Sequence, residues 1–139
     1  MTGEKIGEGN GTRGIRRVVA TQPKFIVEVS FEDASTLLGV TGINLGTYTS
    51  SPKPDGSLEG VGEGVFATPD GESVTWKGMG VGHFVEGGAV RYTGMLSYST
   101  TSTKLAKLNS IAAMFEFDVD ASGKTRSQVY DTSAKAAHA

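Results

Sequence analysis

The sequence predicts an all-β protein, a single antiparallel β-barrel of about eight strands. Turn signals rich in Gly, Pro and Asp recur at short intervals, and segments with alternating side chains, rich in Val, Thr, Phe and Tyr, lie between them. No long helical pattern is present that could cover an open sheet. A sheet without a helical layer buries one face most simply by closing on itself, and a two-sheet sandwich is the alternative.

The predicted strands follow one another in an up-and-down order. The first segment is long enough for one strand or two. The turns between segments, such as Pro69-Asp70-Gly71, supply the positive or fixed φ that a reversal requires. Strands are expected at residues 6–20, 25–31, 40–50, 58–67, 73–85, 89–100, 111–119 and 125–130.

Two short segments depart from this pattern. Residues 32–38 fit a helix, a loop or an extension of the preceding strand. Residues 103–109 fit one short helical turn, because Thr103 offers a cap and Leu105 and Leu108 lie three residues apart. One barrel domain is expected over residues 1–132. The tail, residues 133–139, lacks periodicity and is expected to be flexible.

Alternation predicts which side chains face inward, because residues two apart on a strand share a face. The rows that carry rings and glycines are assigned to the interior, since placing so many rings outside would expose a large apolar patch. The opposite assignment would bury Glu28, Glu63 and Glu116 and favour acid chemistry. In residues 73–85 the inward row is Val74, Trp76, Gly78, Gly80, Gly82 and Phe84.

Glycines at alternate positions form three ladders, at residues 7–11, 60–64 and 78–82. Such a strip has no side chains on one face, so the strand can coil and a ring can lie against its backbone. A dinucleotide-binding loop would require a helix directly after the glycines, and no helical pattern follows any of the three. The ladders are therefore interpreted as barrel glycines.

Three motifs along the chain carry a family resemblance. They are the Asp-Gly hairpin that leads into Gly60-Val-Gly62-Glu-Gly64, the Gly-Gly turn at 87–88, and Lys104-Leu105-Ala106-Lys107-Leu108-Asn109 before a strand. In these the chain resembles small uncharacterised bacterial proteins that share the allene oxide cyclase-like barrel fold. The resemblance implies an antiparallel barrel of about eight strands that often self-associates and whose interior can hold an apolar small molecule. Some such relatives steer cyclisation of a hydrophobic substrate by shape, but no catalytic motif transfers to this chain.

Composition limits the chemistry that this chain can perform. It has no Cys and only two His, one of them in the tail, so a Cys nucleophile and a His-rich metal site are excluded, and no metal or cofactor is expected. A net charge of -2 and one short basic cluster disfavour nucleic acid as a partner. No segment approaches the ~20 apolar residues that span a bilayer, so a soluble, cytoplasmic protein without a membrane partner is expected.

The predicted function is binding of an apolar small molecule inside the barrel, and whether the protein is also an enzyme stays open. A cyclase or isomerase acting by shape would use Asn44, Tyr48 and Tyr92 as catalytic hydrogen-bond donors. The alternative is a non-catalytic carrier, or an oligomeric structural module with a solidly packed barrel. A cavity of roughly 300 Å³ or more would favour binding. The ligand-binding candidates are Arg17, Phe66, Trp76, Tyr98, Phe115 and Phe117.

The outward rows are not cleanly polar. Apolar side chains on neighbouring strands are expected to form a contiguous stripe, and burial of that stripe between copies predicts a homodimer or homotrimer. These side chains are Val61, Val65, Met79, Val81 and Met95.

Overall fold

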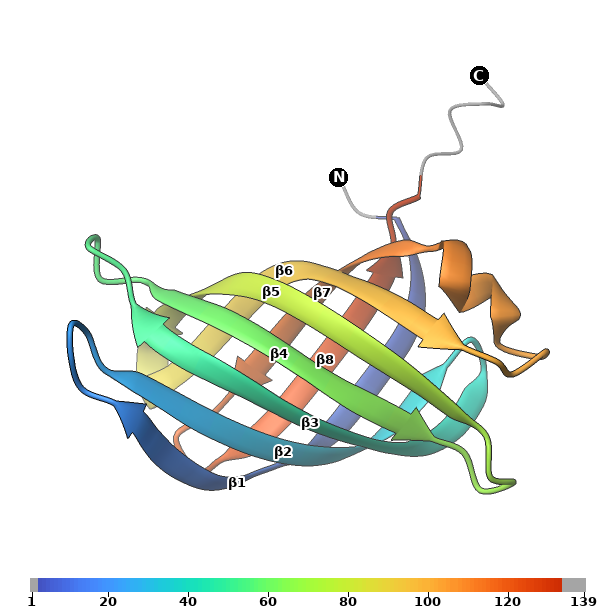
Figure 1. The fold of residues 1–139 in the computed structure, drawn as a ribbon, viewed down its shortest axis with the longest axis horizontal. Helices are drawn as coiled ribbons and strands as arrows, with labels where there is room; N and C mark the ends of the chain where they lie inside the picture. Colours follow the sequence, from blue (N-terminus) through green and yellow to red (C-terminus); the bar gives the residue numbers. More distant parts are fainter. Residues whose placement is uncertain (1–2, 134–139) are drawn as a thin grey trace.

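A computed structural model describes residues 3–133 and places their eight strands in one closed antiparallel barrel (Figure 1). Each strand pairs with the next, and β8 pairs with β1 to complete the ring. This confirms the predicted fold class. The strands are β1 (Glu4–Ala20), β2 (Ile26–Leu37), β3 (Val40–Pro52), β4 (Leu58–Ala67), β5 (Ser73–Val85), β6 (Ala89–Thr100), β7 (Ala112–Val119) and β8 (Lys124–Asp131).

Two segments that the sequence left open are resolved by strand pairing. Residues 6–20 belong to one long strand, β1, and residues 32–37 extend β2 rather than forming a helix or a loop. Ser35, for example, is paired on one side with Gly9 of β1 and on the other with Gly42 of β3. Two ladders of hydrogen bonds outweigh the weak local preference of this segment, whose residues are compatible with several conformations.

Three of the connecting turns share one geometry. Gly56, Gly71 and Gly123 each have a φ between 87° and 90°, and each donates its N–H to the carbonyl three residues earlier at 3.0–3.1 Å. Residues with a side chain rarely adopt this φ, so the Gly in each turn signal fixes where the strand reverses. The turn signals therefore set the barrel's strand lengths.

One end of the barrel is filled by the connection between β6 and β7. It contains the short 3-10 helix η2 (Ala106–Ser110), close to the turn expected at residues 103–109. Thr103 does not cap it; instead the Ser102 hydroxyl accepts the Leu105 N–H at 3.3 Å. Leu105 and Leu108 are fully buried, and they pack in one cluster with Phe66, Val74, Ile111 and Ala113. We call residues Leu105 and Leu108 the plug.

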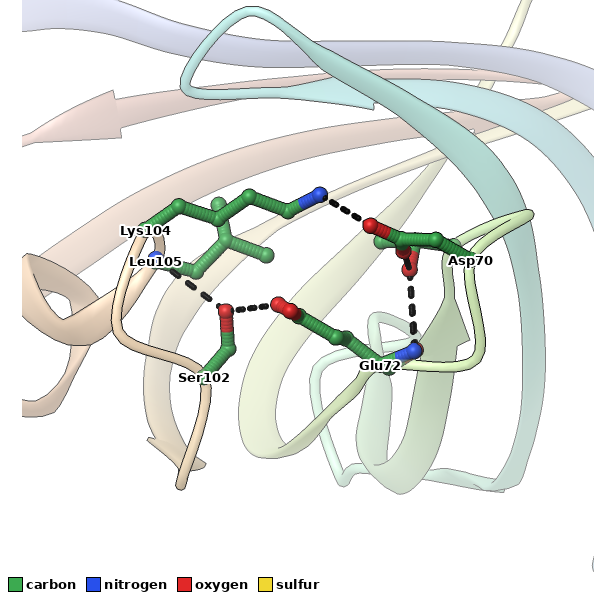
Figure 2. Close-up of polar contacts among 6 residues, drawn as sticks. Asp70, Glu72, Ser102, Lys104 and Leu105 are labelled. Atoms are coloured by element: carbon green, nitrogen blue, oxygen red, sulfur yellow. Dashed lines mark hydrogen bonds and ion pairs between the residues drawn. The ribbon is translucent and has the colours of Figure 1, made fainter.

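Polar contacts connect this plug to the turn between β4 and β5 (Figure 2). Lys104 Nζ lies 2.7 Å from Asp70 Oδ2, and the Ser102 hydroxyl donates to Glu72. Hydrogen bonds from Lys104 and Thr68 lower the pKa of Asp70 to about 2, so its carboxylate stays charged above that pH. These contacts position the connection over the barrel end, while burial of the two leucines provides most of its stabilisation.

The rest of the described chain adds little beyond the barrel. A second 3-10 helix, η1 (Glu86–Gly88), forms the turn between β5 and β6. No helix within residues 3–133 is long and apolar enough to cross a membrane. Of the expected tail, Ser133 accepts the Ala112 N–H with its hydroxyl at 3.0 Å, while residues 134–139 lie outside the described part.

Truncating the plug tests its place in the core. Leu108→Ala should lower the free energy of unfolding by about 2–4 kcal/mol, because it removes buried methyl groups and leaves a cavity. Urea unfolding followed by circular dichroism measures the change. Leu45→Ala, the same substitution at an outer-face side chain that is 51% exposed, is the matched control and should change it by less than about 0.5 kcal/mol. A similar small effect for both variants would contradict a core role for Leu108.

Candidate functional site

The inward rows are those that carry the glycines and most of the rings, but Phe84, which was expected to face inward, is 67% exposed. Phe31, Phe66 and Phe117 are buried, whereas Glu63 and Glu116 are exposed on the outer face. The opposite assignment of faces is therefore wrong. Outer-face charges pair across strands, as in the contact of 2.7 Å between Arg91 Nε and Asp118 Oδ1. His83 is exposed as well.

Five rings meet inside the barrel and are called the aromatic layer: Phe31, Tyr48, Trp76, Tyr92 and Phe117. The centroids of Phe31 and Phe117 lie 4.8 Å apart. Tyr48 meets Tyr92 edge-on at 5.5 Å and Phe117 at 5.7 Å. Tilted and edge-on contacts at these distances are favourable for aromatic pairs, so the layer is a packed unit contributed by β2, β3, β5, β6 and β7.

The glycine ladders make room for these rings. A Cβ on Gly64 would lie 2.4 Å from Cζ2 of Trp76, and one on Gly82 would lie 2.6 Å from Tyr92 Cε2. Trp76 extends from β5 across Gly64 of β4 and donates its indole N–H to Asn44 Oδ1 on β3 at 2.8 Å. This contact between strands that are not neighbours exists because the strand between them has no side chain at that position.

A cavity of about 110 Å³ lies in the interior, lined by rings, glycines and a few polar groups. The structure places eight of the nine candidate residues from the sequence around it. The cavity is smaller than the roughly 300 Å³ typical of a small-molecule site. These eight residues are Asn44, Tyr48, Phe66, Trp76, Tyr92, Tyr98, Phe115 and Phe117.

Arg17 is the exception, and its expected inward position is wrong. The pairing of β1 with β2 shifts between Arg13, opposite Phe31, and Arg16, opposite Val29. Gly14 and Ile15 thus share the single position opposite Ser30, and an extra residue of this kind moves every later side chain to the other face. Arg17 consequently lies outside, with Nη2 at 3.2 Å from Glu28 Oε1.

The three tyrosines of the cavity remain neutral hydrogen-bonding groups. Burial raises the pKa of Tyr48, Tyr92 and Tyr98 above the ordinary value for tyrosine. The Tyr92 hydroxyl lies 2.8 Å from Ser50 Oγ. The Tyr48 hydroxyl has no hydrogen-bond partner among residues 3–133, so it is free to donate to a ligand.

The sequence-based candidates omitted Asp33, which is the most unusual polar group of the interior. It lies on the inward face of β2 between Gly11 and Asn44 on the adjacent strands, and it is only 2% exposed. The Ser35 hydroxyl donates to its Oδ1, while its Oδ2 has no hydrogen-bond partner within the described chain. A buried carboxyl group without a cation beside it is rare in proteins and marks a candidate site.

Burial raises the pKa of Asp33 above its usual value, and the polar side chains of Ser35 and Asn44 oppose this shift only in part. Val27, Val29 and Phe31 alternate on the inward face, and the next inward position in this alternation is Asp33. The predicted strand ended at residue 31, so the pattern was not followed as far as Asp33. No group of three or more metal-ligating side chains is found within residues 3–133.

Replacing this carboxyl group gives a pH-dependent change in stability. Because the pKa is raised in the folded state, wild-type stability falls as the pH rises through that pKa and the buried group becomes charged. Asp33→Asn keeps the shape and the acceptor for Ser35, so at pH 8 it should be more stable than wild type by about 1–3 kcal/mol. Thermal unfolding from pH 4 to 8 should show this gain shrinking toward pH 4. Glu63→Gln, on the exposed face, should show no such trend, and a destabilised Asp33→Asn at pH 8 would refute the explanation.

Comparisons with known proteins support the fold and no more. No family model and no curated protein matches the sequence. A conserved protein of unknown function from Rhodopseudomonas palustris is similar in structure with a TM-score of 0.78 at 12% identity, over 92% of this chain and 95% of that one. A β-barrel-like protein from Acinetobacter baumannii gives 0.78 at 13%, covering 92% and 93%. An enzyme from Penicillium herquei gives 0.65 at 15%, covering 92% of each chain. The chain thus has the closed barrel of small bacterial proteins that are themselves uncharacterised.

Proposed function

We propose that the barrel binds a compact, largely apolar small molecule in its interior cavity. The observation that carries the proposal is the lining, which combines packed rings and bare glycine backbone with a small number of polar groups. This combination is the usual anatomy of a small-molecule site. Asn44, Trp76 and the tyrosines would orient the ligand, and the phenylalanines would provide apolar contact.

The size of the cavity restricts the ligand. An apolar protein cavity of about 150 Å³ is known to stay dry and to bind benzene or xenon. A cavity of about 110 Å³ suits a molecule of that size or smaller. A long hydrophobic chain would fit only if the aromatic layer moved apart.

A cyclase or isomerase acting by shape is the second candidate, and it would use the same cavity. It is supported by the resemblance to the allene oxide cyclase-like barrels and by the free hydroxyl of Tyr48. Tyr92 is less available to a substrate, because its hydroxyl shares a hydrogen bond with Ser50. Asn44 accepts the Trp76 indole N–H through its Oδ1, which leaves its amide N–H groups as donors. Plain binding depends less than catalysis on how these donors are placed.

Xenon tests whether the cavity accepts an apolar guest. In wild-type protein under xenon pressure, NMR shift changes should concentrate at residues that line the cavity. Ser127→Leu should abolish them, since Ser127 lines the cavity and a leucine there would fill it. Ser99→Leu, on the exposed face of β6, is the matched control and should respond like wild type. If the wild type shows no xenon-dependent shifts in the interior, a structural module with a solidly packed barrel would be favoured instead.

Self-association through the outer face remains a prediction. Val61, Met79, Met95 and Met114 are direct neighbours across β4, β5, β6 and β7, and the first three are 47–58% exposed. Light scattering at micromolar concentration should give a dimer or trimer for the wild type, because burial removes this row from water. Met95→Glu should shift the protein to a monomer, whereas Ser97→Glu, beside the row, should leave the oligomer intact. A monomeric wild type would exclude the prediction.

A further inference from the structure

The polar corner of the cavity is dominated by hydrogen-bond acceptors. The Ser35 side chain lines the cavity, and its hydroxyl proton is used in the hydrogen bond to Asp33 Oδ1. The lone pairs of Ser35 Oγ are therefore left for a ligand. Asn44 also lines the cavity, and its Oδ1 accepts the indole N–H of Trp76. A ligand at this corner would be held best by a group that donates hydrogen bonds.

In its ionised form, Asp33 places a negative charge behind Ser35, which strengthens this preference. Asp33 forms no ion pair with a Lys, Arg or His of the described chain, and its Oδ2 remains without a partner. In a water-excluded interior, a carboxylate acts on a nearby charge far more strongly than it would in water. A positively charged ligand group would gain this attraction, while a negatively charged group would be repelled.

Aromatic rings next to the same corner favour the same ligand charge. Trp76, which is hydrogen-bonded to Asn44, and Phe31, two residues before Asp33 on the same face of β2, both line the cavity. Ring faces attract a cation that lies within about 6 Å of the ring centroid. Carboxylate, acceptor hydroxyl and ring faces therefore all complement an ammonium group.

We propose that Ser35, backed by Asp33 and flanked by Trp76, is the recognition site for the ammonium group of a compact amine whose apolar part fills the cavity. This inference rests on the proposed ligand-binding function and specifies its ligand class. Ser35 Oγ would accept a hydrogen bond from the ammonium, and Asp33 would act through Ser35 as a positioning and charge-balancing residue.

Three probes of one shape and different charge test the inference at pH 7: butylammonium, 1-butanol and butyrate. NMR titration of wild-type protein should give butylammonium an affinity about tenfold higher than that of 1-butanol, because a charge-assisted hydrogen bond is stronger than a neutral one. Butyrate should bind more weakly than 1-butanol. Equal affinity for 1-butanol and butylammonium would overturn the inference and leave the proposed function standing.

Two variants locate the effect. Asp33→Asn should reverse the preference, so that 1-butanol binds at least as tightly as butylammonium, because the cation would then lose its counter-charge. Ser35→Ala should reduce butylammonium binding severalfold more than 1-butanol binding, and it decides the question if Asp33→Asn does not fold. Glu63→Gln removes one carboxylate from the outer face and should keep the wild-type preference. If none of the three probes binds wild-type protein and xenon does not enter, the proposed function fails and the inference fails with it.

Discussion

Closure of the sheet is the constraint on which the rest of this structure depends. Once β8 pairs with β1, every inward side chain competes for the same narrow space, and large rings fit only where the facing backbone is bare. Trp76 lies over Gly64 and Tyr92 lies against Gly82 for this reason. The glycines bury no side chain of their own, and the rings that pack over them provide much of the apolar contact in the aromatic layer.

The same interior keeps a cavity beside the aromatic layer. Gly60 and Gly80 line the cavity without a side chain, and ring atoms of Tyr92 and Phe115 lie 3.0–3.1 Å from where a Cβ on each would be. Part of the interior beside these rings is unfilled, although packed protein cores contain few voids larger than a water molecule. Within this largely apolar space a buried carboxyl group is costly, and Asp33 is stabilised only in part by Ser35 and Asn44.

Sequence patterns predicted the barrel, most strand positions and the inward faces, because alternation and turn chemistry are local properties. The errors came from pairing between distant strands. Arg17 changes face because Gly14 and Ile15 share one position opposite Ser30, and nothing in the local pattern marks that bulge. Asp33 was overlooked because residues 32–37 become a strand only through pairing with β1 and β3. Bulges and register depend on contacts that a single sequence does not display.

Similarity of fold and similarity of site have different requirements in a barrel of this kind. Structures with TM-scores near 0.78 at 12–13% identity indicate that very different sequences form a barrel of this shape. A carboxyl group beside a cavity-lining serine requires particular residues at two positions of β2, and an indole that crosses a strand to reach an amide requires three more on β3, β4 and β5. The fold by itself therefore does not specify these interior contacts, and a shared barrel carries no inference about a shared site.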